Sequence, residues 1–565
     1  MKRSSPRAKL RILTITTWTL GLSLQFVSAQ HPDSHKVPDK KEGPVAPRLQ
    51  NLGTHHHPVT TKSDLAQTFF DQGLRLVYAF NHAEAGRSFR EAARLDTACA
   101  MAYWGQALAL GPNINAPMEP SSHEEAWQAL QKALALKPKA SKKEQAYIDA
   151  LAKRYSQDPK ADRRPLDEAF AQAMGKVSKQ YPDDLDAATL YAEALMDLQP
   201  WSYWNRDGSP RGAALQIVSL LESVLKRNPN HPGALHYYIH AVEASRAPER
   251  GVAAADRLGP LMPAAGHLVH MPAHIYIRVG RYADASESNI KAVAADEDYI
   301  TQCRAQGIYP LAYHPHNIHF LWAALTLEGR SAQAIEEARK VASKAKPELL
   351  REPGLSMMQQ FLVIPLYAFS RFGKWDEILR EPPPPEDLHY PLGVWHYARG
   401  LAYTGKGQWK EAEQELESLK QLAAEPALKE LKLWDLNPAA GLLEIASEAL
   451  AGELAAKKGD LEKAVMHLDR AVRLEDAQLY NEPPDWHYPV RQSLGAVLLK
   501  AGRPLEAEVV YWEDLKRNPE NGWSLFGLAQ SLKAQGKTDQ VEEIEKRFRK
   551  AWAKADIELK ESRIL

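Results

Sequence analysis

The sequence lacks most of the features that assign a protein to a class by its chemistry. Among 565 residues there are only two cysteines, Cys99 and Cys303, and no Cys-x-x-Cys pair, which excludes a disulfide framework, a zinc ribbon and a thioredoxin-like redox site. Lysine and arginine (71) balance aspartate and glutamate (71), so the formal net charge is zero. Proteins that bind nucleic acid carry a basic surplus, so we expect no nucleic-acid partner.

Long hydrophobic runs are missing beyond the N-terminus. Five of the first eleven residues are basic, residues 12–27 are mostly apolar, and Val27-Ser28-Ala29 precedes Gln30 with small residues two apart, which is the layout of a cleaved signal peptide. An apolar run of 16 residues is shorter than the roughly 20 that span a membrane. We therefore predict a signal peptide at residues 1–29 and an exported protein, periplasmic or secreted, with no stable membrane span.

Strand patterns are absent as well. Residues 30–62 are rich in proline, lysine and histidine and are predicted to form a flexible leader, with His55-His56-His57 in a solvated loop. From Asp64 onward the apolar residues recur at helical spacing, which predicts an all-α fold. A turn of the form Gly-x-bulky-x-x-small recurs at Gly280, Gly329, Gly373, Gly407, Gly459, Gly502 and Gly536. Two of these spacings are 34 residues, the period of a helix-turn-helix repeat.

Several residues around these turns carry a family resemblance. They are Ala85-x3-Phe89 with Ala92, Ala273-x2-Tyr276 before Gly280, Gly495-x2-Leu498 before Gly502, and the closing prolines Pro229 and Pro519. On these residues the sequence resembles the tetratricopeptide repeat family, and phrases such as HMPAHIYIRVGRYADA are similar to a group of exported bacterial members. The resemblance implies an elongated α-solenoid of stacked antiparallel helix pairs with loop insertions, whose first helices line a concave groove, and it implies no activity.

Two segments are expected to interrupt the repeats. Residues 198–211 form a loop with two exposed aromatic candidates for ligand contact, Trp201 and Trp204, and Pro382 to Pro385 form a stiff spacer. We therefore predict an N-terminal solenoid block at residues 63–380, which carries the histidine-rich groove, and a C-terminal block at residues 381–565.

Histidine is the residue type that is concentrated in one region: nine of the 20 histidines lie between His231 and His319. His270 and His319 both lie ten residues before their turn glycines, and His267 and His316 both lie thirteen before. One 34-residue period earlier, His236 falls at the position that corresponds to His270. Three consecutive repeats are therefore predicted to place histidines at equivalent positions on their first helices.

These positions predict a metal site in the groove. Neighbouring helices pack about 8–10 Å apart, so imidazoles from two helices can reach one ion at about 2.0–2.1 Å per bond. The candidate ligands are His236, His240, His267, His270, His274, His314, His316 and His319. Imidazole donors suit Zn, Cu, Fe or Ni and do not distinguish among them. Arg278, on the helix of His274, is a candidate to hold a carboxylate or phosphate group.

Three functions remain open at this stage, and the sequence does not decide whether the protein is an enzyme. The first is a binding protein whose groove holds the metal together with a peptide, a protein or a small ligand. The second is a metalloenzyme, either a hydrolase that uses metal-activated water or a copper or iron oxidoreductase, with Glu243 as candidate base. The third is a metal-free scaffold of the cell envelope. The sequence contains no HExxH, GxSxG, Walker or GxGxxG motif.

Overall fold

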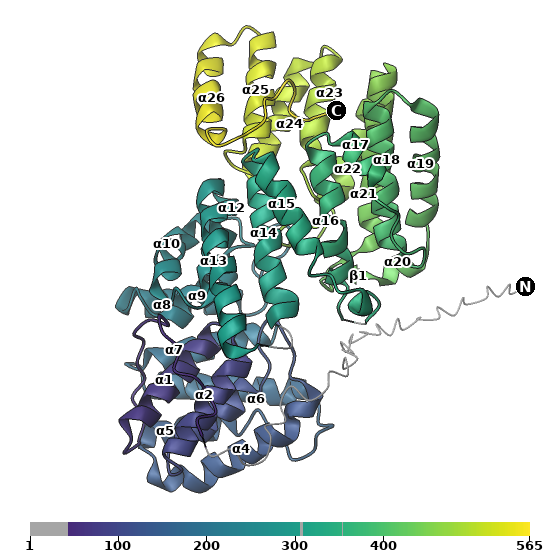
Figure 1. Ribbon diagram of the computed structural model, residues 1–565. Helices are drawn as coiled ribbons and strands as arrows, with labels where there is room; N and C mark the ends of the chain where they lie inside the picture. Colours follow the sequence, from purple (N-terminus) through teal and green to yellow (C-terminus); the bar gives the residue numbers. More distant parts are fainter. Residues whose placement is uncertain (1–42, 306–308, 353) are drawn as a thin grey trace, which may run out of the picture.

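The structure is a computed structural model that describes residues 43–305, 309–352 and 354–565. These residues form 26 α-helices and one pair of two-residue strands, which confirms the all-α prediction (Figure 1). The predicted signal peptide lies outside the described residues, as does the predicted leader up to residue 42. None of the described helices is long and apolar enough to cross a membrane.

The first half of the chain runs from purple to teal in Figure 1. Its helices are α1 (Asp64–Tyr78), α2 (His82–Leu95), α3 (Ala100–Ala109), α4 (His123–Leu136), α5 (Lys142–Leu151), α6 (Arg163–Gln180), α7 (Leu185–Asp197), α8 (Ala214–Arg227), α9 (Pro232–Val242), α10 (Val252–Leu261), α11 (Gly266–His270), α12 (Pro272–Arg278) and α13 (Tyr282–Cys303).

The second half runs from teal to yellow. Its helices are α14 (His314–Leu327), α15 (Ser331–Ala342), α16 (Met357–Arg371), α17 (Trp375–Arg380), α18 (His389–Gly405), α19 (Trp409–Ala423), α20 (Ala427–Glu430), α21 (Ala439–Lys458), α22 (Leu461–Asp476), α23 (Val490–Lys500), α24 (Pro504–Arg517), α25 (Gly522–Ala534) and α26 (Thr538–Ala551). Strand β1 (Lys432–Leu433) pairs antiparallel with β2 (Asn437–Pro438).

Each helix pair follows from an amphipathic sequence and a glycine turn. Helix α22 buries Ala464, Leu468 and Ala471 on one face and packs between α21 and α23, because its single apolar stripe needs a neighbour on each side. Gly459 ends α21 with φ 89°, and the Asp460 side chain accepts a hydrogen bond from a backbone N–H in the first turn of α22. All seven predicted turn glycines have φ between 66° and 89°, so the predicted turn positions are confirmed.

Aromatic rings packed between glycines set the spacing of consecutive helices. The ring of Phe89 on α2 lies between Gly73 of α1 and Gly105 of α3, where an added Cβ would come within 2.7 and 2.4 Å of ring atoms. In the C-terminal half, the ring of Tyr511 on α24 lies between Gly495 and Gly527 in the same way. The same packing of an aromatic ring between two glycines therefore recurs in both halves of the chain, as expected for stacked repeats.

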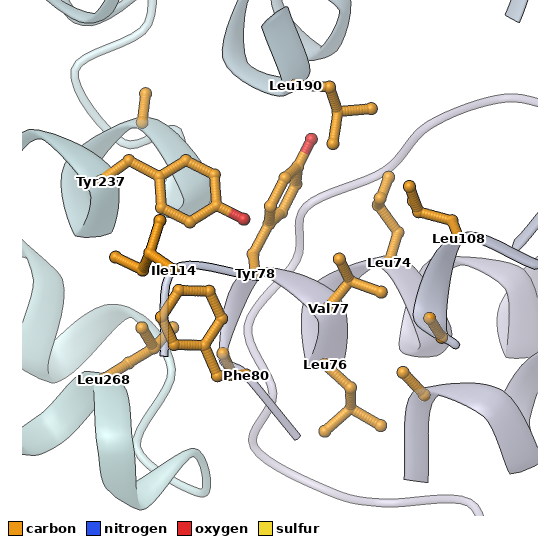
Figure 2. Close-up of a cluster of buried hydrophobic side chains, with 14 of the residues drawn as sticks. Leu74, Leu76, Val77, Tyr78, Phe80, Leu108, Ile114, Leu190, Tyr237 and Leu268 are labelled. Carbon is orange, nitrogen blue, oxygen red and sulfur yellow. The ribbon is translucent and has the colours of Figure 1, made fainter. Parts of the chain in front are cut away.

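Two apolar clusters fill the interior, and they meet near α13 and α14. The first includes buried residues from Ala46 to Ala324, part of which is shown in Figure 2, and the second includes buried residues from Val293 to Leu559. The predicted block boundary at residue 380 lies inside the second cluster. Pro382 to Pro385 do not divide it, because α16 and α18 on either side of this segment pack directly on each other.

The C-terminal repeats return to the middle of the chain. The indole Nε1 of Trp523 donates a hydrogen bond to the carbonyl of Thr326 (3.1 Å), and the Tyr282 hydroxyl donates to the carbonyl of Pro519 (2.8 Å). Asp556 accepts hydrogen bonds from two backbone N–H groups at the start of α15 (2.7 and 2.9 Å). The solenoid is therefore folded back on itself, in contrast to the elongated form that the resemblance implies.

Residues 43–62 of the predicted flexible leader lie against the first helices. The backbone N–H of Val45 donates to Glu91 (2.9 Å), that of Leu49 donates to Gln72 (2.9 Å), and that of Thr60 donates to Glu144 (2.6 Å). In this part the leader is held by specific hydrogen bonds, because buried carboxylates and amides of α1, α2 and α5 face it.

We predict that the glycines that face these aromatic rings do not tolerate an added methyl group. Gly105→Ala should lower the free energy of unfolding by about 1–3 kcal/mol, because its Cβ collides with Phe89. Gly86→Ala is the control: an added Cβ meets nothing nearer than 3.9 Å within α2, so alanine should stabilise by up to about 1 kcal/mol. Urea unfolding followed by circular dichroism measures both, and equal stability of the two variants would contradict this packing.

Candidate metal centre

Six histidine side chains from four helices meet where the two apolar clusters join. Their imidazoles form two groups of three, within each of which the candidate ligand atoms all lie within 4.8 Å of one another. The first triad is defined as His236, His240 and His267, and the second triad as His270, His274 and His316. The first draws on α9 and α11, and the second on α11, α12 and α14.

A proline divides the helix that contributes most to both triads. Pro272 occupies the first position of α12, where it needs no N–H partner, and the preceding residues form the five-residue helix α11. His267 and His270 lie on α11 and His274 lies on α12. The sequence motif HLVHMPAH thus places one histidine in the first triad and two in the second.

Three hydrogen bonds and one ion pair fix the Nδ1 atoms of four of the six imidazoles. Nδ1 of His236 lies 2.7 Å from the carbonyl oxygen of Tyr78, which can only accept. In the same way His240 Nδ1 donates to Glu243 (3.0 Å) and His270 Nδ1 to the amide oxygen of Asn289 (2.7 Å). Nδ1 of His274 forms an ion pair with Glu243 at 2.7 Å. A proton on each Nδ1 leaves Nε2 as the free donor atom, which is how outer hydrogen bonds orient histidines that bind metals.

The Nε2 atoms point at one another. Nε2 of His236 lies 3.1 Å from Nε2 of His267, and Nε2 of His270 lies 2.8 Å from Nε2 of His274. Two nitrogens bound to one ion at about 2.0–2.1 Å lie about 2.8–3.4 Å apart for bond angles between 90° and 109°. Among the described residues, His240 Nε2 and His267 Nδ1 are buried without a hydrogen-bond partner.

Burial keeps most of these imidazoles neutral, the form that binds metal. Desolvation, reinforced by neighbouring imidazoles, lowers the pKa of each of four histidines, namely His236, His267, His270 and His316. His274 is different: burial opposes its charge, but Glu243 and Glu482 outweigh burial and raise its pKa to about 10. Burial alone would raise the pKa of Glu243, yet His274 and His240 hold it below the usual range.

A phenylalanine packs against the rings of each triad. The ring centroid of Phe80 lies 4.5–6.2 Å from the three rings of the first triad, and that of Phe320 lies 4.9–5.9 Å from the three rings of the second triad. Phe80 has φ 57°, a left-handed conformation that bulky residues rarely adopt (Figure 2). The fold therefore maintains a strained residue that packs against the first triad.

The triads are buried and do not line an open groove as predicted. The imidazoles of both triads are at most 3% exposed except that of His316, which is half-buried. Segments remote in sequence cover them: Trp201 packs against His240 (ring centroids 5.0 Å apart) and Trp434 against His316 (5.8 Å). Glu482, between α22 and α23, forms an ion pair with His274, with 3.1 Å between the carboxylate and Nδ1.

Two predicted ligands lie outside both triads. His314 faces Asp296, with its Nδ1 3.6 Å from the carboxylate. His319 stacks on Trp322 (ring centroids 5.3 Å apart) and packs against Phe361 on α16. Burial alone lowers the pKa of His319 to about 3. His270 and His319 lie at the same distance before their turn glycines, but they do not meet in the structure. The ring that meets that of His270 belongs to His316, one helical turn earlier on α14 (ring centroids 4.9 Å apart).

The other predicted site residues are occupied by structural contacts. Arg278 donates to the backbone carbonyls of Glu243 and Ser245 and lies 5.1 Å from the ring of Tyr480, so its guanidinium is already engaged. Trp204 donates its indole N–H to the carbonyl of Ala241 (2.8 Å), and Trp201 is 40% exposed beside the first triad. Glu243, the candidate base, orients two imidazoles and is not free to accept a proton from water.

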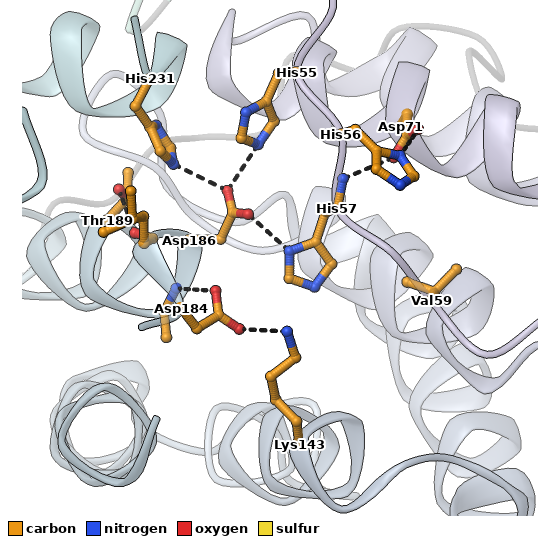
Figure 3. Close-up of polar contacts among 12 residues, drawn as sticks. His55, His56, His57, Val59, Asp71, Lys143, Asp184, Asp186, Thr189 and His231 are labelled. Carbon is orange, nitrogen blue, oxygen red and sulfur yellow. Dashed lines mark hydrogen bonds and ion pairs between the residues drawn. The ribbon is translucent and has the colours of Figure 1, made fainter. Parts of the chain in front are cut away.

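A second histidine cluster surrounds Asp186, as Figure 3 shows. Its carboxylate lies 2.9 Å from Nε2 of His55, 2.7 Å from Nδ1 of His57 and 3.2 Å from Nε2 of His231, and it accepts the Tyr78 hydroxyl (2.5 Å). Nδ1 of His231 accepts the N-cap hydrogen bond of α9, so its proton is on Nε2, directed at Asp186. Every neighbour is a donor to this one carboxylate.

The Asp186 cluster is therefore an anchor for the leader. Burial would raise the pKa of Asp186, but the hydrogen bonds from His231, His55 and His57 outweigh burial and hold it well below the usual range. Burial lowers the pKa of His57, but the hydrogen bond and the negative charge of Asp186 raise it by more, so the net shift is upward. His57 is only 4% exposed, so the prediction of a solvated His55-His56-His57 loop is wrong for this residue.

Comparison with known proteins assigns no family. No protein-family model and no curated protein matches the sequence. Among solved structures, the human IFIT1 dimer with m7Gppp-AAAA is 12% identical, with a TM-score of 0.31 over 81% of this chain and 90% of that chain. The APC/C hetero-tetramer Cut9-Hcn1 is 14% identical (TM-score 0.30; 83% and 76% covered), and yeast Tom70 is 13% identical (TM-score 0.28; 88% and 93%). Likeness at this level does not bear on function.

We predict that Asp186→Asn releases residues 43–62. Losing one partner of a buried charge cluster costs about 3 kcal/mol, which corresponds to roughly hundredfold faster amide exchange in this segment if it opens locally. Asp183→Asn, in the same turn but with a 99% exposed side chain, should leave exchange unchanged. Hydrogen–deuterium exchange measures both, and unchanged protection in Asp186→Asn would contradict the anchor.

The same anchor predicts a pH dependence. The depressed pKa of Asp186 adds stability that is present above its ordinary value of 3.8 and is lost as pH falls through the folded value. The raised pKa of His57 adds stability that is complete below 6.5 and is lost as pH rises through the folded value. Protection of residues 43–62, corrected for intrinsic exchange rates, should therefore be greatest between these two values and decline on both sides.

Proposed function

We propose that this protein is a metal-binding helical-repeat protein, whose two histidine triads hold transition-metal ions. The observation that carries the proposal is the pairing of Nε2 atoms at 2.8 and 3.1 Å while the opposite ring nitrogens of His236, His270 and His274 are held by oxygen acceptors. Two nitrogens at this distance either share a proton in an N–H···N hydrogen bond or bind one metal ion.

Protons alone leave the site incompletely satisfied. A proton between His270 and His274 is compatible with the raised pKa of His274, and a proton between His236 and His267 satisfies that pair, so neither pair by itself separates a proton from a metal ion. His240 Nε2 remains buried without a partner in both cases. An unsatisfied buried nitrogen costs about 1–3 kcal/mol. A metal ion in the first triad binds His240 Nε2 and needs no proton between the paired nitrogens, so the geometry favours metal over protons.

The donor set suits late transition metals. Each triad offers three imidazoles, of which His274 gives up a proton when it binds a metal, and the carboxylates of Glu243 and Glu482 lie behind histidines as outer partners. Such a set suits Cu or Zn, and Fe or Ni less specifically, whereas Mg and Ca prefer oxygen ligands. When bound, such an ion acts as a Lewis acid or a redox centre. This chain's own contribution is to orient four of the six imidazoles through Glu243, Asn289 and the Tyr78 carbonyl.

Metal retention tests the proposal. The variant His236→Gln/His270→Gln removes one ligand from each triad, and after dialysis against metal-free buffer it should retain at least tenfold less metal than the wild type. His319→Gln is the matched control, because His319 is equally buried on α14 but outside both triads. Elemental analysis measures the metal, and circular dichroism checks that all three proteins are folded.

Two outcomes would overturn the metal site. One is wild-type protein that holds no stoichiometric metal after exposure to Cu and Zn. The other is a folded His236→Gln/His270→Gln variant that retains as much metal as His319→Gln.

We also propose that the protein works outside the cytoplasm. The support is the basic, apolar and small-residue succession that ends at Ala29. Protein expressed with its full N-terminus should be recovered from the periplasm or medium with Gln30 as its first residue. N-terminal sequencing checks this, and an intact Met1 would contradict export by cleavage.

A further inference from the structure

The two triads form one continuous group of six imidazoles. Ring centroids of His240 and His274 are 5.8 Å apart, and those of His267 and His270 are 6.0 Å apart, so each contact crosses from the first triad to the second. Distances of this size match those within each triad, which run from 4.7 to 6.1 Å. Ions held in the two triads would therefore be immediate neighbours.

One carboxylate couples the triads. Oε1 of Glu243 lies 3.0 Å from His240 Nδ1 in the first triad, and Oε2 lies 2.7 Å from His274 Nδ1 in the second. Glu243 is 1% exposed, so both of its oxygens are committed to these rings. A shared outer partner fixes the orientation of the two triads relative to each other, as a site for two ions requires.

The number of donors indicates two ions. Three neutral nitrogens from the protein leave a late transition metal with at least one open coordination position. Six imidazoles around a single ion would leave none, and the separation of the donors into two triads, each within 4.8 Å, also argues against one shared centre. Two three-coordinate ions side by side present their open positions to the same small volume.

The surroundings of the rings favour ions of low charge. Among the described residues, only two carboxylates, Glu243 and Glu482, lie against the imidazoles of the triads. The nearby Arg278 and Asp296 have opposite charges. Two monovalent ions are less costly to bury in such a place than two divalent ions. Imidazole donors suit copper, whose monovalent form is Cu(I).

We propose, building on the metal binding proposed above, that the six-histidine site holds two Cu(I) ions and binds dioxygen between them. Each Cu(I) gives up one electron to become Cu(II), and O₂ takes both electrons to become a peroxide that bridges the two ions. No proton is needed, no bond to the protein forms, and the net charge of the site is unchanged, because two added positive charges on copper match the two negative charges of peroxide. Release of O₂ reverses each step.

Loading wild-type protein with Cu(I) under anaerobic conditions is the first test. The expected result is about two Cu(I) ions per chain that resist dialysis. Admission of O₂ should then produce intense near-ultraviolet and visible charge-transfer bands, while the sample stays silent in electron paramagnetic resonance because the two Cu(II) spins couple. Removal of O₂ should bleach the bands.

Two variants locate the effect. His316→Gln removes one ligand of the second triad at its half-buried edge, and it should retain one copper and give no charge-transfer band on oxygenation. His319→Gln, on the same helix, should behave as the wild type. If His316→Gln does not fold, the wild-type protein alone tests the proposal, because its copper content and the spin coupling of its ions are measured directly.

Each contrary outcome has a distinct meaning. Protein that binds neither copper nor zinc overturns both the metal site and the dicopper proposal. One copper per chain, two coppers that give the resonance of isolated Cu(II), or retention of zinc with no retention of Cu(I) leaves metal binding standing and overturns the dioxygen proposal.

Discussion

The buried carboxylate of Glu243 is the interaction on which the candidate centre depends. It lies where the two apolar clusters meet, and it holds one imidazole from each triad by Nδ1. A carboxylate in such a place is tolerated only because the neighbouring rings and their protons compensate its charge. Because it attracts a proton to Nδ1 of each ring, it directs the Nε2 atoms of His240 and His274 away from itself and toward the other imidazoles. The protonation pattern of the site thus originates from a residue that need not touch a metal ion.

The helical repeats supply the rigidity that this arrangement requires. The first triad rests on the end of α1, through the Tyr78 carbonyl and the Phe80 ring, and the second rests on α13 and α14, through Asn289 and Phe320. The Glu482 segment reaches His274 from the second apolar cluster. The partners of the second triad come from both halves of the chain, whereas those of the first triad come from the first half.

The sequence alone predicts the repeats well and the site in part. Turn glycines are visible because each needs a left-handed backbone, and the histidine enrichment is visible in the composition. The register of α14 could not be predicted, since the π-turn at Tyr309–Tyr313 changes which histidine faces α11. Glu482 was missed for a related reason: it lies more than 200 residues from His274, and no spacing rule connects a loop between α22 and α23 to α12.

The two histidine clusters show why residue type alone does not identify a metal site. Around Asp186, three histidines direct N–H groups at one carboxylate, so the donor atoms that a metal needs are already protonated and paired. In the triads the carboxylate and carbonyl acceptors lie on the far side of the rings, and the unprotonated nitrogens face each other. Both clusters contain buried histidine and acid at similar distances. The different roles that we propose for them follow from which ring nitrogen carries the proton, and that is set by helix caps, carbonyls and carboxylates that only the folded chain brings into place.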